Sequence, residues 1–189
     1  MTRTLVALLL STTFAVGACQ KNDSTTADNN TLPVDTLTVN NADLANAATN
    51  SNVDAAFVTD GIKGDTGEVA IGQLAASKGA SQAVKDFGNM LATDHGAHKQ
   101  KLVDLANSAG IPVPTEPAEE GQSNLQKLQT LSGAEFDKTF AQMMVASHHK
   151  GIAKNETQAK SGDAQTAKLA EETLPVLKKH LATAESLAK

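Results

Sequence analysis

Several histidines and carboxylates fall on the apolar faces that their own segments would form as helices. An α-helix turns about 100° per residue, so residues three, four or seven apart lie on one face. His148 thus shares a face with Phe140 and Met144, whereas His149 points about 100° away. The inward-facing candidates, drawn from four separate segments, are Glu68, Asp94, His95, Asp137, His148 and His180.

Imidazole and carboxylate groups that converge inside a bundle have two explanations. A buried carboxylate is costly unless it is paired or coordinated, and facing helices build metal sites from these same groups. The first explanation is a mononuclear site of His95, His148, His180 and one carboxylate, whose nitrogen and oxygen ligands suit Zn²⁺, Cu²⁺ or Ni²⁺. The second is a structural layer in which histidines pair with carboxylates. Under the first we expect one transition-metal ion, such as copper, zinc or iron, whose identity the sequence does not give.

Met144 bears on which metal the site would bind, and the absence of enzyme motifs bears on whether the protein is a catalyst. Met144 lies one turn before His148 and would be either a soft thioether ligand for Cu(I) or core filler. Asp94 has Ala97 three residues later, and the Glu-x-x-His pattern of di-iron bundles is absent from the chain. No Gly-x-Ser-x-Gly motif occurs either. We therefore favour a binding or stress-protection module over an enzyme. A structural or interaction module is the alternative, and metal-dependent redox chemistry a weaker one.

Helix start and stop signals divide the chain from residue 53 onward. Ser81 and Asp163 are candidate N-caps, and Ser132 with Glu135 has the spacing of a capping box. No segment has the pattern of a strand. The expected helices are 53–78, the segment from Ser81 to Gly110, a short one near 118–130, 132–161, and the segment from Asp163 to the C-terminus.

The lengths of these helices and of their connections predict a fold. A helix of about 25 residues is roughly 37 Å long and cannot bury its apolar face alone, so a four-helix bundle is expected. Short links make the first two and the last two long helices antiparallel pairs. About twenty residues, including the short extra helix, separate the pairs. The sequence therefore predicts an all-α, ferritin-like four-helix bundle over 53–189, with a long crossover between its second and third long helices.

The N-terminal segment resembles a bacterial lipoprotein signal. A short basic start precedes an apolar run, and Val16-Gly17-Ala18-Cys19 resembles a lipobox with its cysteine at the lipidated position. We expect 1–18 to be a signal peptide, and 19–52 to be the lipidated Cys19 followed by a polar tether. Gln20 after the cysteine points to the outer membrane, with the domain facing the periplasm. The alternative is an ordinary signal peptide followed by a spare thiol.

Composition excludes some partners. Without 1–18 the chain has no arginine, tryptophan or tyrosine, and its acidic residues outnumber its lysines. It therefore lacks the phosphate-binding forks and stacking platforms of nucleic-acid binding. The single cysteine leaves no intrachain disulfide. The expected partner is the membrane, through the lipid. The sequence does not identify protein partners, and a homodimer of the bundle stays possible.

Four motifs carry a family resemblance. They are Glu68-Val69-Ala70, the segment Met90–His95, the segment Leu131–Asp137 and the segment Leu174–His180. In this order, over 53–187, they resemble domain-of-unknown-function family 4142, ferritin-like bacterial secreted and lipid-anchored proteins. The stretch from Phe136 to His149 is also similar to family 305, some of whose members bind copper. The resemblance implies that the six candidates above are the residues to follow, and it implies no activity.

Overall fold

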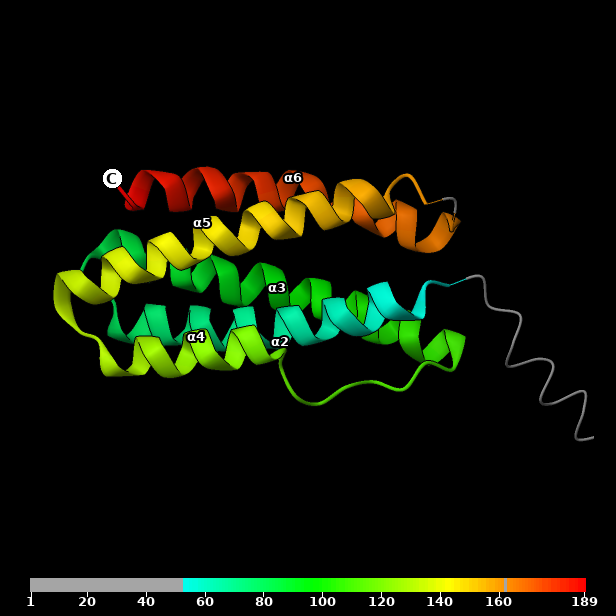
Figure 1. The fold of residues 1–189 in the computed structure, drawn as a ribbon, viewed down its shortest axis with the longest axis horizontal. Coiled ribbons are helices and arrows are strands. Elements are labelled where there is room, and N and C mark those ends of the chain that lie inside the picture. The colour runs from blue at the N-terminus through cyan, green and yellow to red at the C-terminus, as the bar shows by residue number, and fades with distance from the viewer. Residues whose placement is uncertain (1–52, 162) are drawn as a thin grey trace, which may run out of the picture. The chain divides into compact units, whose positions relative to one another are not determined.

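The computed structural model describes residues 53–161 and 163–189. The predicted signal peptide 1–18 and the whole predicted segment 19–52, with Cys19 and the tether, lie outside the described residues. The described chain is all-helical (Figure 1), which confirms the predicted fold class. Its helices are α2 (Ala55–Lys78), α3 (Gln82–Ala109), α4 (Glu119–Thr130), α5 (Gly133–Gln158) and α6 (Ala164–Leu187). None of these helices combines the length and apolarity needed to cross a membrane.

Polar N-caps start three of the four long helices. Ser81 Oγ accepts from the Val84 N–H at the start of α3, and Asp163 Oδ1 accepts from the Gln165 N–H at the start of α6. An acceptor there satisfies backbone donors that have no partner within the helix. The capping-box prediction at Ser132 is wrong, because its side chain makes no cap hydrogen bond. Ser132 does occupy the N-cap position of α5, but its side chain accepts no hydrogen bond from the first turn.

Two helical hairpins, α2–α3 and α5–α6, form the bundle (Figure 1). After α3 the chain turns at Gly110, which has the left-handed φ of 68° that favours glycine. The segment 111–118 and α4 then carry the chain back along α2 to the start of α5. The Ala118 N–H donates to the Lys63 carbonyl over 3.2 Å, which fixes this crossover to α2. The long crossover with its short helix is as predicted.

Small residues bring the helices of the first hairpin close together. A Cβ atom added to Gly88 of α3 would lie 2.5 Å from the Ala76 nitrogen and 2.6 Å from the Gly72 oxygen of α2. No side chain fits at this crossing, so the backbones of α2 and α3 are in direct contact there. This contact sets the spacing of the helices that carry the polar residues one to two turns further along.

A polar layer divides the apolar core into two clusters. One cluster contains Phe87, Leu91 and Phe140, and the other contains Phe57 and Leu102 with their neighbours. The buried polar side chains that fall between the clusters along the helices include Asp65, His95, His148 and His180. A buried polar layer is costly unless its members find partners. Its hydrogen bonds therefore decide what it can do.

Candidate metal centre

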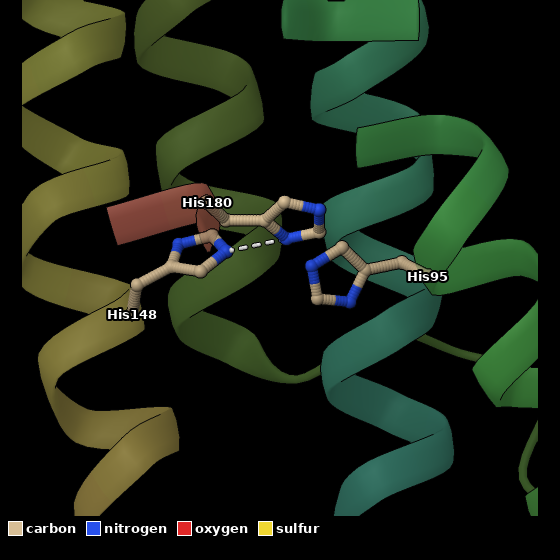
Figure 2. A group of neighbouring side chains, drawn as sticks. All are labelled: His95, His148 and His180. Atoms are coloured by element: carbon tan, nitrogen blue, oxygen red, sulfur yellow. Dashed lines mark hydrogen bonds between the residues drawn. The ribbon is translucent and has the colours of Figure 1, made fainter. Parts of the chain in front are cut away.

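Three histidines from three helices converge in the polar layer. His95 lies on α3, His148 on α5 and His180 on α6, and their side chains point toward one another (Figure 2). One ring nitrogen from each lies within 4.8 Å of the other two. The residues are 7%, 2% and 0% exposed, respectively. Three buried imidazoles at this separation could form a metal site.

The ring of His95 is oriented by a carboxylate of α2. His95 Nδ1 lies 2.8 Å from Asp65 Oδ1. An ionised carboxylate only accepts hydrogen bonds, so Nδ1 carries a proton and donates it. The Nε2 atom is buried without a hydrogen-bond partner and faces the other two rings (Figure 2). Histidines that bind metals usually have this arrangement: a carboxylate accepts from one ring nitrogen, and the other ring nitrogen is free to bind the metal.

The other two rings are anchored in the same manner. His148 Nδ1 donates to the Met144 backbone carbonyl over 2.9 Å. His180 Nε2 donates to Asp94 Oδ2 over 2.9 Å. These bonds leave His148 Nε2 and His180 Nδ1 as the inward atoms, and the two lie 3.2 Å apart. When both rings are neutral and anchored in this way, two lone pairs face each other across that distance.

The separation of 3.2 Å between these two nitrogens fits a shared cation. Zinc binds imidazole nitrogen at about 2.0–2.1 Å, so two neighbouring ligands of a tetrahedral ion lie roughly 3.3–3.4 Å apart. Without a cation or a shared proton, the facing lone pairs repel. The inward nitrogens of His148 and His180 are therefore already close to the spacing that a metal ion requires, and a nitrogen of His95 lies within 4.8 Å of them.

Glu68 of α2 supplies the negative charge beside the three rings. Its Oε1 accepts from Ser147 Oγ, while its Oε2 is buried without a partner. The charge of Glu68 acts on all three imidazoles, favouring their protonated forms. The same charge would stabilise a metal cation, which makes Glu68 the candidate fourth ligand.

Burial and charge divide the three imidazoles into two neutral rings and one basic ring. Burial lowers the pKa of His148 to about 4, and the neighbouring His95 and His180 add to this effect against Glu68. Burial also lowers the pKa of His180, although its hydrogen bond to Asp94 opposes the change. Burial opposes protonation of His95 too, but the bond to Asp65 and the nearby carboxylates outweigh it and raise the pKa of His95. His95 is thus the most basic of the three rings, so a proton competes with a metal ion most strongly at this histidine.

Asp65 and His98 belong to this layer although neither was among the predicted site residues. Asp65 Oδ2 accepts from His98 Nδ1 over 2.8 Å, so one carboxylate holds two histidines of α3. The two bonds overcome the effect of burial and lower the pKa of Asp65. The sequence did contain a signal, because Asp65 lies seven residues after Val58 and three after Ile62, on the buried face of α2.

Asp137, one of the predicted metal-site residues, does not join the histidine cluster. Asp137 lies near the N-terminal end of α5, where its carboxylate accepts from the backbone N–H groups of Ala80 and Ser81, over 2.8 Å each. It shares a helix face with His148 but precedes it by three turns, or about 16 Å at 1.5 Å per residue. Periodicity gives the direction of a side chain, not its height along the bundle.

Asp94 and Met144 have supporting positions. The Asp94 side chain is 35% exposed and holds His180 from outside the cluster. The Met144 side chain is fully buried in the apolar cluster of Phe87 and Phe140, while its backbone carbonyl holds His148. Core filler is therefore the interpretation of the Met144 side chain that its surroundings support.

The fold and this cluster define a class: an all-α four-helix bundle with three buried histidines that could form a metal site. The sequence profile of the family described as "Domain of unknown function (DUF4142)" matches residues 39–187, so the chain belongs to that family. A comparison with curated proteins gives no match.

Among solved structures, the chain is similar to one titled "Crystal structure of DUF305 fragment from Deinococcus radiodurans". The TM-score is 0.64 at 12% sequence identity, and the match covers 71% of this chain and 93% of that one. At this identity the likeness shows a shared fold. The resemblance to both families that the motifs indicated is confirmed.

Proposed function

We propose that this protein binds one transition-metal ion at the histidine cluster. The ligands are His95 Nε2, His148 Nε2 and His180 Nδ1, with Glu68 as the fourth. One observation carries the proposal: each ring is anchored through one nitrogen, so that the other nitrogens converge. Three neutral imidazoles and a carboxylate suit Zn²⁺ and Cu²⁺ best, and also accept iron.

We further propose that the protein works as a lipid-anchored metal-binding protein of the bacterial envelope. The lipobox-like Val16–Cys19 and Gln20 support attachment to the outer membrane, with the bundle facing the periplasm. The burial of this metal site between apolar clusters supports storage or protection rather than catalysis. Acylation is tested by metabolic labelling with a fatty acid, which Cys19→Ser should abolish.

Elemental analysis of the untagged protein, purified without chelator, tests metal binding. About one equivalent of copper, zinc or iron is expected, and zinc titration should show one saturable site. His148→Asn keeps a donor for the Met144 carbonyl but removes Nε2, so the site should be lost. His149→Asn is the matched control, because the His149 side chain is 61% exposed and next in sequence. A protein that takes no metal, or a His148→Asn variant that binds normally, contradicts the proposal.

A structural role is the second candidate, because the outer hydrogen bonds of the layer are complete without a metal. The pairs Asp65–His95 and Asp94–His180 already join α2 to α3 and α3 to α6. If the role is structural, neither the wild type nor the His148→Asn variant contains metal. The substitution then only lowers the free energy of unfolding, by about 1–3 kcal/mol, because it leaves a buried polar partner of His148 unpaired.

A further inference from the structure

A cavity of about 480 Å³ leads from the histidine cluster to the surface of the bundle. Its wall contains the buried rings of His95, His148 and His180. The same wall contains Gly64 of α2 and Lys154 of α5, both of which are exposed. A buried metal site needs an entry path for the ion, and this cavity joins the proposed site to solvent.

Two side-chain bridges join α2 to α5 beside this cavity. Ser147 Oγ donates to Glu68 Oε1 in the layer of the histidine cluster. About two turns away, Lys154 Nζ donates to Asp60 Oδ2 over 2.7 Å, and all four of these residues line the cavity. At 1.5 Å per residue, the two bridges are about 11 Å apart along the helices. They mark the two ends of one stretch of the groove between α2 and α5.

Both helices carry glycine in the stretch between the two bridges. Gly64 lies one turn from each bridging residue of α2, and Gly151 lies one turn from each bridging residue of α5. Both glycines line the cavity. A Cβ atom added to Gly64 would meet nothing within 4 Å, and one added to Gly151 would meet only Leu177 Cδ1, at 3.7 Å. The two missing side chains leave an opening between α2 and α5, which we call the glycine window.

Proposed metal ligands lie directly inside the glycine window. Glu68 is one turn from Gly64 on α2, and His148 is one turn from Gly151 on α5. Glu68 Oε2 is buried without a hydrogen-bond partner, so it has a lone pair free for an incoming cation. A hydrated cation that passes the window would first exchange water for this oxygen, and the inward ring nitrogens would then complete its coordination.

We propose that the metal ion enters and leaves the histidine cluster through the glycine window. The inference rests on the proposed metal site and adds the route by which that site is filled. Entry and exit by one route share one transition state, so a side chain that fills the window raises both barriers by the same amount. The dissociation constant then stays the same, because it is the ratio of the two rate constants. A side chain that distorted the ligands would change the dissociation constant instead.

Stopped-flow zinc exchange tests this route. The protein is the full chain carrying Cys19→Ser, which removes its only thiol. Uptake is followed by mixing metal-free protein with zinc and a weak chromophoric indicator, and release by mixing loaded protein with an excess of a strong chromophoric chelator. Gly64→Leu and Gly151→Leu should each slow uptake and release about tenfold, which corresponds to about 1.4 kcal/mol of added barrier. The dissociation constants of both variants for zinc should equal that of the wild type.

Ala97→Leu is the matched control. Ala97 lies on α3, is exposed and lines the same cavity outside the window, so the added bulk should leave both rates unchanged. Far-UV circular dichroism checks that each variant is folded.

Three results would overturn the proposed route. Both glycine variants exchange zinc at the wild-type rates, Ala97→Leu slows exchange as much as they do, or only release changes, so that the dissociation constant rises. Equilibrium zinc titration of the same samples separates the two proposals. A wild type that binds no zinc contradicts the metal site and the route together, whereas normal affinity with unchanged rates in the variants contradicts the route alone.

Discussion

The pH dependence of stability offers the sharpest test of the histidine layer. Burial lowers the pKa of His148 from 6.5 to about 4. Between these values the unfolded chain takes up a proton at this residue and the folded chain does not, so the free energy of unfolding falls as the pH falls. Each unit of pKa difference is worth 1.36 kcal/mol, and the loss from about pH 7 to about pH 4.5 comes to roughly 2 kcal/mol.

Urea unfolding of the metal-free protein, followed by far-UV circular dichroism in EDTA, measures this loss. The His148→Asn variant should lose roughly 2 kcal/mol less than the wild type over the same pH interval. His180 contributes in the same direction as His148, and His95 in the opposite direction, but both are present in the two proteins and largely cancel in the difference. Replacement of the exposed His149 by Asn should leave the pH dependence unchanged. Parallel pH curves for His148→Asn and the wild type would refute the assignment of His148 as a buried neutral ring.

Three further predictions concern Asp65, two glycines of α2 and Asp137. In the Asp65→Asn variant, the amide cannot accept from both α3 histidines as an ionised carboxylate does. The affinity for zinc should therefore fall about 10- to 100-fold in a competition titration. Unchanged affinity would mean that Asp65 does not orient His95. Gly72→Ala should destabilise the protein in urea unfolding, because the added Cβ would lie 2.7 Å from a backbone oxygen. Gly64→Ala should stabilise it by up to about 1 kcal/mol, because a Cβ there meets nothing within 4 Å and alanine favours the helix. Asp137→Ala should lower the free energy of unfolding by about 1 kcal/mol in the same assay, because the carboxylate accepts from two backbone N–H groups. It should leave the affinity for zinc unchanged. A loss of zinc binding in this variant would place Asp137 at the metal.

The polar layer also accounts for how two apolar clusters coexist in one small bundle. Each cluster packs at its own end, and the histidines with their carboxylates occupy the space between them. The bonds from Asp65 to His95 and from Asp94 to His180 link α3 to helices of both hairpins. The layer is thus both a candidate metal centre and a junction between the two hairpins.

Much of the fold follows from local sequence signals. The caps at Ser81 and Asp163, the stop at Gly110 and the long link between hairpins predict five helices and their connections, all of which the structure contains. These signals depend on backbone groups within a few residues, which is why the sequence reveals them. Ser132 shows the limit, because its spacing suits a capping box but its side chain makes no cap bond.

The candidate site divides between what the sequence determined and what only the tertiary structure decided. The sequence placed His95, His148 and His180 on inward faces, because a helix has a fixed turn per residue. It could not tell that Asp137 sits at one end of the bundle, that Asp65 holds both His95 and His98, or which nitrogen of each ring faces inward. These features depend on how far the helices slide along one another and on which acceptor of a neighbouring helix reaches each ring. Only packing across the bundle sets those distances.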